Sequence, residues 1–217
     1  MAHEHAERPE TEARHADGLP YDRHMHHADW EHVWERQRQR EPMERGWLDT
    51  LGLEPGARVA DVGSGPGFIS LLAAERVGAG GRVYAVDRSP EALAFLRQQL
   101  AVRPAASVEP LVGAATAIPL PDASVDRALV AQMLHHDDTP QAILFEVLRV
   151  LAPGGRLLIV EHDPDGSEES GPPRAERLPA ERVREWLAAA GYVDVADCAA
   201  GEGRYGLLAQ KPDIGGS

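Results

Sequence analysis

The stretch Val59-Ala-Asp-Val-Gly-Ser-Gly-Pro-Gly-Phe68 joins an apolar run to a glycine-rich turn and to the start of a second apolar segment. The run before Gly63 has the composition of a buried strand, and the segment from Phe68 onward has that of a helix. A second apolar run, Val83-Tyr-Ala-Val-Asp87, ends in a carboxylate. In a doubly wound sheet the carboxyl ends of neighbouring strands share one ligand-binding crevice. The sequence therefore predicts a binding site together with an α/β fold.

The glycine turn and Asp87 suit a cofactor that contains adenosine. Glycines at positions 63, 65 and 67 allow backbone N–H groups to approach a ligand without interference from a Cβ atom. The Asp87 carboxylate can accept hydrogen bonds from two ribose hydroxyls. Nicotinamide sites space their glycines as G-x-G-x-x-G, whereas here Phe68 stands where the third glycine of that pattern would lie. This spacing disfavours a nicotinamide-dependent oxidoreductase.

Four motifs follow one another between Val59 and Glu161. Asp61-Val-Gly-Ser-Gly-Pro-Gly67 matches the pattern D-[VI]-G-[SA]-G-x-G. The three later motifs are Gly113-Ala-Ala-Thr-Ala-Ile-Pro-Leu-Pro-Asp122 with Ser124-Val-Asp126, Arg127–His136, and Leu148–Leu157. Together the four motifs resemble those of the class I S-adenosylmethionine-dependent methyltransferases, in their small-molecule group (type 11, similar to enzymes of ubiquinone and menaquinone biosynthesis).

The resemblance implies S-adenosylmethionine as cofactor and a small molecule as methyl acceptor. The family usually has an aspartate where this chain has Ala114, and that aspartate accepts a hydrogen bond from the adenine amino group. We therefore expect adenine to be held by the backbone at Ala115 and by apolar contact. The implied cofactor residues are Asp61, Gly63, Ser64, Gly65 and Gly67 at the methionine moiety, Asp87 at the ribose, Arg88, Ala114 and Ala115 at adenine, and Ala131 and Gln132 near the transferred methyl.

Two adjacent histidines, His135 and His136, follow the expected fourth strand at the ligand-binding edge. A base is needed only when the acceptor is protonated at the working pH, and these histidines are the candidates for it. The alternative is that they contact the cofactor or cap a loop. Glu161, His162 and Asp163 close the next strand at the same edge, where they either face the acceptor or begin a polar loop.

Composition restricts the class of partner. The chain has 217 residues, 43% of them hydrophobic and 26% charged, as expected for one globular domain with a sizeable core. Its formal net charge is −13, from 35 acidic and 22 basic residues. Binding to nucleic acid or to an anionic membrane needs clustered lysines and arginines, so neither partner is expected.

The amino terminus lacks the apolar core of a signal peptide, and we expect a cytoplasmic protein. The single cysteine, Cys198, excludes an intrachain disulfide and fits a reducing compartment. One cysteine also argues against arsenite methylation by a thiol-rich site, since capture of a soft metalloid takes several thiolates. The sequence indicates neither the acceptor nor the oligomeric state.

The expected organisation has four parts: a mobile His-rich tail at 1–20, a helical lid at 21–53, the cofactor-binding domain at 54–211 and a short tail at 212–217. The lid would place Tyr21, His27 and Trp30 over the acceptor, whereas Trp34 and Trp47 suit ordinary helix packing. His24, His26, His27 and His32 raise the possibility of a metal, but they lack a known ligand frame, and no metal site is predicted. A non-catalytic protein that binds the cofactor or a metal on the same fold remains an alternative.

Hydrophobic periodicity and capping signals predict the elements. Pro42 should divide the first helical region, and Ser89-Pro90 and Thr139-Pro140 each combine a cap with a first-turn proline. The predicted fold is a doubly wound, Rossmann-like sheet of seven mostly parallel strands, with a C-terminal antiparallel hairpin and helices on both faces. After the first two, the expected strands are 108–112, 128–131, 156–161, 192–198 and 205–210, and the expected helices include 68–77, 90–102 and 181–190.

Overall fold

The computed structural model describes residue 25 and residues 28–105, 107–166 and 171–213. The predicted tail at 1–20 and the histidines at 24, 26 and 27 lie outside these residues, as does Tyr21. Across the described ranges, every helix is too short or too polar to cross a lipid bilayer.

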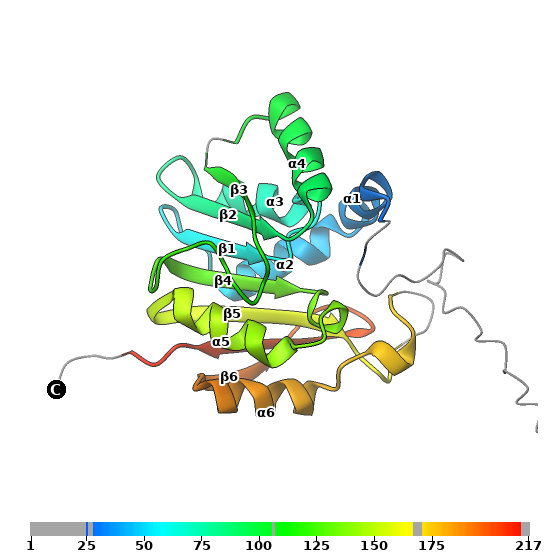
Figure 1. Ribbon diagram of the computed structural model, residues 1–217, viewed down its shortest axis with the longest axis vertical. Helices are drawn as coiled ribbons and strands as arrows, with labels where there is room; N and C mark the ends of the chain where they lie inside the picture. The colour runs from blue at the N-terminus through cyan, green and yellow to red at the C-terminus, as the bar shows by residue number, and fades with distance from the viewer. Residues whose placement is uncertain (1–24, 26–27, 106, 167–170, 214–217) are drawn as a thin grey trace, which may run out of the picture.

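Seven strands form one sheet in the order β3-β2-β1-β4-β5-β7-β6 (Figure 1). Strands β1 to β5 pair in parallel, and β7 runs antiparallel to both β5 and β6. The predicted fold class is therefore confirmed. The strands are β1 Arg58–Val62, β2 Arg82–Asp87, β3 Val108–Val112, β4 Val125–Ala131, β5 Leu151–His162, β6 Val193–Cys198 and β7 Arg204–Gln210.

Helices cover both faces of the sheet (Figure 1). Apolar side chains of α2, α3 and α4 form one buried cluster against the sheet, and those of α5 and α6 form a second cluster on the opposite face. The helices are α1 Trp30–Gln39, α2 Glu41–Leu51, α3 Phe68–Val77, α4 Pro90–Val102, α5 Pro140–Val150 and α6 Ala180–Ala190, with 3-10 turns η1 Leu134–His136 and η2 Arg174–Glu176.

Local signals place most of the helix ends. Pro42 lies in the first turn of α2, and Arg40 separates this helix from α1, which ends at Gln39, so the division occurs where it was predicted. Ser89 caps α4 by accepting a hydrogen bond from the Ala92 N–H at 3.1 Å. Thr139 is the N-cap residue of α5 and Pro140 begins the helix, as predicted. The Thr139 side chain forms no capping hydrogen bond, because its hydroxyl and its backbone N–H both donate to Asp137 instead.

Two strand boundaries also differ from prediction. Strand β4 begins at Val125, because Val125 pairs with Leu151 across the sheet. Strand β5 begins at Leu151 and continues through the Pro-Gly-Gly segment at 153–155. The sequence-based expectation started both strands later, since glycine, proline and charged residues interrupt their apolar runs.

The two helices before β1 have different surroundings. Trp47 in α2 is 1% exposed, and its indole N–H donates to the Ala200 carbonyl at 3.0 Å. Trp34 in α1 packs edge-on against Phe68 with 5.0 Å between ring centroids. Both tryptophans therefore pack as predicted. Other α1 residues, including Trp30, line the cavity described next. The domain boundaries and the lid role of residues 21–53 stay predictions.

Candidate cofactor and acceptor site

A cavity of about 720 Å³ opens at the carboxyl ends of the parallel strands. Strands β1 and β4 are neighbours there although they are not consecutive, so the order of the sheet reverses between them. Ligands of doubly wound sheets bind at this kind of reversal. The volume lies within the range of about 300–1,000 Å³ that is usual for small-molecule sites. The fold therefore places the cavity where the sequence predicts a ligand.

The glycine turn between β1 and α3 forms one wall of the cavity. Gly63 has a φ of 73°, and a Cβ atom added to it would lie 2.8 Å from Cγ of Met133. Gly65 has a φ of 54° and lines the cavity itself. Such left-handed backbone favours glycine, so the turn keeps its shape because both positions lack a side chain.

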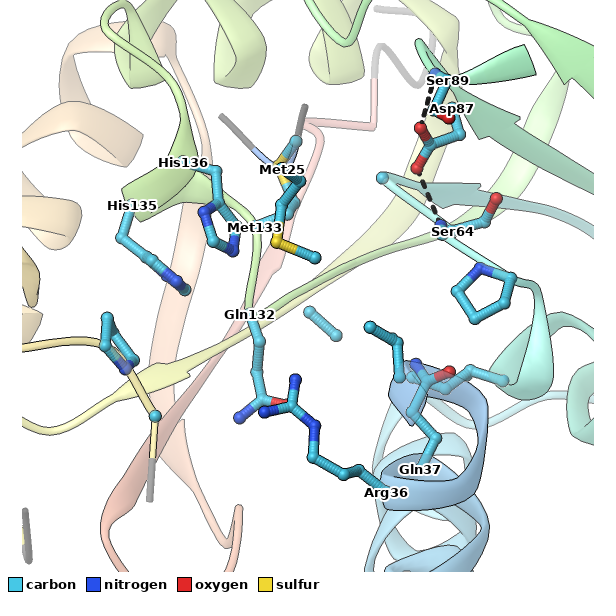
Figure 2. A pocket seen from close by; sticks show the side chains of 18 of the residues that line it. Met25, Arg36, Gln37, Ser64, Asp87, Ser89, Gln132, Met133, His135 and His136 are labelled. Carbon is cyan, nitrogen blue, oxygen red and sulfur yellow. Dashed lines mark hydrogen bonds between the residues drawn. The ribbon is translucent and has the colours of Figure 1, made fainter. Parts of the chain in front are cut away.

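Asp87 ends β2 and connects the glycine turn to the next loop. One carboxylate oxygen accepts from Gly65 N–H at 2.7 Å, and the other accepts from Ser89 N–H at 2.8 Å (Figure 2). Burial raises the pKa of this carboxyl, and the backbone bonds oppose that rise. Each carboxylate oxygen has a second lone pair, so Asp87 can still accept from ligand hydroxyls in the cavity.

Ser64 provides an independent test of whether the site fits a polar cofactor. Its side chain lines the cavity and is 5% exposed. Its hydroxyl has no hydrogen-bond partner among the residues that the structure describes. A buried hydroxyl without a partner costs free energy, and a ligand in the cavity would satisfy it. The residues present therefore fit a cofactor with polar groups at the glycine turn.

Most of the predicted cofactor residues share this cavity. Asp61 and Gly67 lie behind its wall instead: the Asp61 carboxylate accepts from the Ser70 hydroxyl at 2.5 Å, and burial raises its pKa to about 6. A Cβ atom on Gly67 would lie 2.5 Å from Leu96, so this glycine allows α3 and α4 to pack closely. The predicted residues that do line the cavity are Gly63, Ser64, Gly65, Asp87, Arg88, Ala114, Ala115, Ala131 and Gln132.

The candidate bases His135 and His136 also line the cavity (Figure 2). His135 is 3% exposed, and its Nδ1 lies 2.6 Å from a carboxylate oxygen of Glu161. The other oxygen of Glu161 accepts from Leu134 N–H at 2.7 Å. Glu161 is therefore held by η1 and in turn orients the imidazole of His135. The two histidine rings lie 4.0 Å apart between centroids.

Gln132 and His162 form a second polar pair in the cavity wall. The Gln132 amide nitrogen lies 2.8 Å from Nε2 of His162. Burial, together with the neighbouring charges of Arg204, Arg177 and Arg40, lowers the pKa of His162 to about 2. His162 is therefore neutral and accepts a hydrogen bond from the amide. Gln132 has a φ of 53°, a strained conformation that is characteristic of functional sites.

Sequence reasoning missed the arginines of the cavity. Arg36 and Arg40 come from the α1 region, and Arg204 begins β7. It also missed Glu44, which is fully buried in α2 next to Arg40. Glu44 precedes Trp47 by three positions and Leu48 by four, so helical periodicity could have placed it on the buried face. No pattern in the sequence indicates that Arg204 lines the same cavity as residues of α1.

The doubly wound sheet, the glycine turn and the acidic end of β2 define a Rossmann-like protein with a cofactor-sized cavity. A methyltransferase domain family matches residues 60–159. A crystal structure of an S-adenosylmethionine-dependent methyltransferase from Aquifex aeolicus is 30% identical, covers 77% of this chain and 89% of its own, and superposes with a TM-score of 0.73. The chain belongs to the class I S-adenosylmethionine-dependent methyltransferases, in the type 11 group.

Curated relatives match over shorter parts of their length. An uncharacterized methyltransferase from Mycobacterium tuberculosis is 44% identical over 128 residues, which are 59% of this chain and 48% of the relative. An arsenite methyltransferase from Halobacterium salinarum is 36% identical over 107 residues, 49% of this chain and 27% of the relative. The chain thus spans less than half of the length of these two relatives.

Proposed function

We propose that this protein transfers a methyl group from S-adenosylmethionine to a small-molecule acceptor. One observation carries the proposal: a single cavity joins the glycine turn and Asp87 to the histidines of η1. Membership in the methyltransferase family supports this reading over a nicotinamide-dependent oxidoreductase. The alternative of a metal-binding role rests on the histidines at 24, 26 and 27, which lie outside the described residues, and the zinc titration below tests it.

In this proposal the cofactor lies along the ends of β1, β2 and β4. The Ser64 hydroxyl would bond to its methionine moiety, and Asp87 would accept from its ribose hydroxyls. The N–H groups of residues 63–65 and 67 already donate within the protein, so the glycine turn would contribute close approach to the cofactor and no further donor. Adenine would lie against Arg88 and Ala115 without the family's usual aspartate. Bound S-adenosylmethionine supplies an electrophilic methyl group on a sulfonium. The protein then has to orient the acceptor in line with that methyl and exclude water.

His135 is the proposed general base. Its Nδ1–H donates to Glu161, and in this tautomer Nε2 carries the lone pair that would take a proton from the acceptor. A carboxylate behind a histidine fixes its tautomer and stabilises the imidazolium that forms. His136, which is more exposed, would contact the acceptor or the cofactor beside it.

Arsenite is an unsuitable acceptor despite the name of one relative. Cys198 is the chain's single cysteine, and it lies in β6 and is not among the residues that line the cavity. Burial raises the pKa of its thiol, so the reactive thiolate is disfavoured. We therefore place the acceptor among organic small molecules.

Calorimetric titration with S-adenosylhomocysteine, NADH and zinc in parallel tests the proposal. We expect S-adenosylhomocysteine alone to bind, and to stabilise the fold by about 2.7 kcal/mol at 100 times its dissociation constant. A screen of organic acceptors for S-adenosylhomocysteine release then tests turnover. Absence of S-adenosylhomocysteine binding at millimolar concentration would refute the proposed function.

A further inference from the structure

The end of the cavity opposite the adenine site is rich in arginine. His162 and Arg204 are direct cross-strand neighbours in the antiparallel β5–β7 pair, at the ligand-binding edge of the sheet. Arg36 and Arg40 reach the same cavity from the α1 region. Figure 2 shows the side chains of Arg36 and Gln132 directed into this space. The strands and the helix thus bring together three guanidinium groups that are far apart in sequence: Arg36, Arg40 and Arg204.

Among the described residues, the three arginines of this wall outnumber the carboxyl groups beside them, Glu44 and Glu202. Burial lowers the pKa of Arg204 to about 10, and the cations Arg40, Arg177 and Arg36 act in the same direction. Glu44 opposes them, but burial raises its own pKa to about 8, so it carries a proton at neutral pH. The wall is therefore cationic inside a chain whose formal net charge is −13.

Two of these arginines retain unused donors. The Nε–H groups of Arg40 and Arg204 are buried and have no acceptor among the residues that the structure describes. Leaving a buried donor without an acceptor costs more than an ordinary hydrogen bond gains, and the cost is larger for charged groups. An oxyanion in the cavity would satisfy both donors and offset the charge. Arginine suits this task because its planar fork matches a carboxylate.

We propose that the methyl acceptor is a small organic carboxylate held by Arg40 and Arg204. The proposal rests on the methyltransferase function proposed above. A cofactor that contains methionine brings one carboxylate of its own, and one bidentate arginine is enough to bind it. The wall holds three arginines, so a second anion has partners. Met25, Trp30 and Val33 line the same cavity and would contact the apolar body of the acceptor.

The test compares acids with their uncharged amides on protein saturated with S-adenosylhomocysteine. The probes are benzoate against benzamide and acetate against acetamide, titrated by calorimetry. We expect at least one acid to bind at least tenfold more tightly than its amide. Arg40→Gln and Arg204→Gln should each remove that preference. Arg97→Gln, which removes a charge from the exposed face of α4 outside the cavity, should retain it.

A second titration shows whether the arginines bind the carboxylate of the acceptor or the amino-acid carboxylate of the cofactor. S-adenosylhomocysteine is compared with 5′-methylthioadenosine, which lacks the amino-acid carboxylate. If Arg204→Gln and Arg40→Gln weaken S-adenosylhomocysteine but not methylthioadenosine, and acids show no preference, the arginines serve the cofactor and the inference is overturned. Equal binding of acids and amides, or no binding of either, to a protein that binds S-adenosylhomocysteine overturns this inference alone. Failure to bind S-adenosylhomocysteine overturns the proposed function as well.

Discussion

Replacing Glu44 by glutamine should remove a pH-dependent loss of stability from this protein. Glu44 has none of its surface exposed, and neither carboxyl oxygen has a hydrogen-bond partner among the described residues. Burial raises its pKa from 4.5 to about 8; Arg40 and Arg204 act in the opposite direction, and Asp61 adds to the rise. The buried carboxyl is thus more easily protonated in the folded protein than in the unfolded chain.

The sign of the effect follows from proton binding. Between pH 4.5 and about 8 the folded state binds the proton and the unfolded state has lost it, so the free energy of unfolding falls as pH rises. The contribution of protonated Glu44 to the free energy of unfolding is therefore fully present below pH 4.5 and is lost as the pH rises to about 8. At about 1.36 kcal/mol per pH unit, the loss approaches roughly 5 kcal/mol, an upper bound because buried charges induce relaxation.

Urea unfolding of Glu44→Gln and the parent at about pH 5, 7 and 9 measures this difference. The two proteins should differ by a small, fixed amount at the lowest pH, and the variant should gain relative to the parent as pH rises. Glu54→Gln, on the exposed turn before β1, controls for the loss of one carboxyl. A difference that stays constant with pH, or a parent that gains stability, would show instead that Glu44 is ionised and paired with Arg40, 3.8 Å away.

Three further variants test the site. Asp87→Ala should weaken S-adenosylhomocysteine binding by about 1.5–3 kcal/mol in calorimetry, the scale of a hydrogen bond to a charged group; unchanged affinity would place the ribose elsewhere. Gly67→Ala should lower the free energy of unfolding in urea by at least about 1 kcal/mol, because its φ is 83° and its Cβ would lie 2.5 Å from Leu96. A fully stable variant would show that Leu96 moves aside. Glu161→Gln should reduce kcat by about 10–100-fold with little change in cofactor KM, since Glu161 orients His135. Loss of cofactor affinity instead would assign Glu161 to cofactor binding.

Local sequence was sufficient for much of the fold. Apolar runs, helix caps and glycines are signals that depend only on residues close together in the sequence, and they predicted β1, α3, β2 and α4 in the right order. The glycine turn and Asp87 belong to adjacent elements, so their meeting at the hydrogen bond from Gly65 follows from parallel pairing of β1 and β2. The sequence did not show whether the Thr139 hydroxyl would cap α5 or donate to the nearby Asp137 carboxylate, and the structure shows the second.

The sequence by itself determined the doubly wound fold and the meeting of the glycine turn with Asp87, because both depend on short-range patterns. Only the tertiary structure decided the arginine wall of the cavity. Arg204 meets Arg40 because β7 inserts between β5 and β6 and returns to the edge that α1 covers. It also decided the protonation state of Glu44, since a pKa depends on burial and on neighbours brought from other elements. Contacts of this kind join distant segments, and no local pattern encodes them.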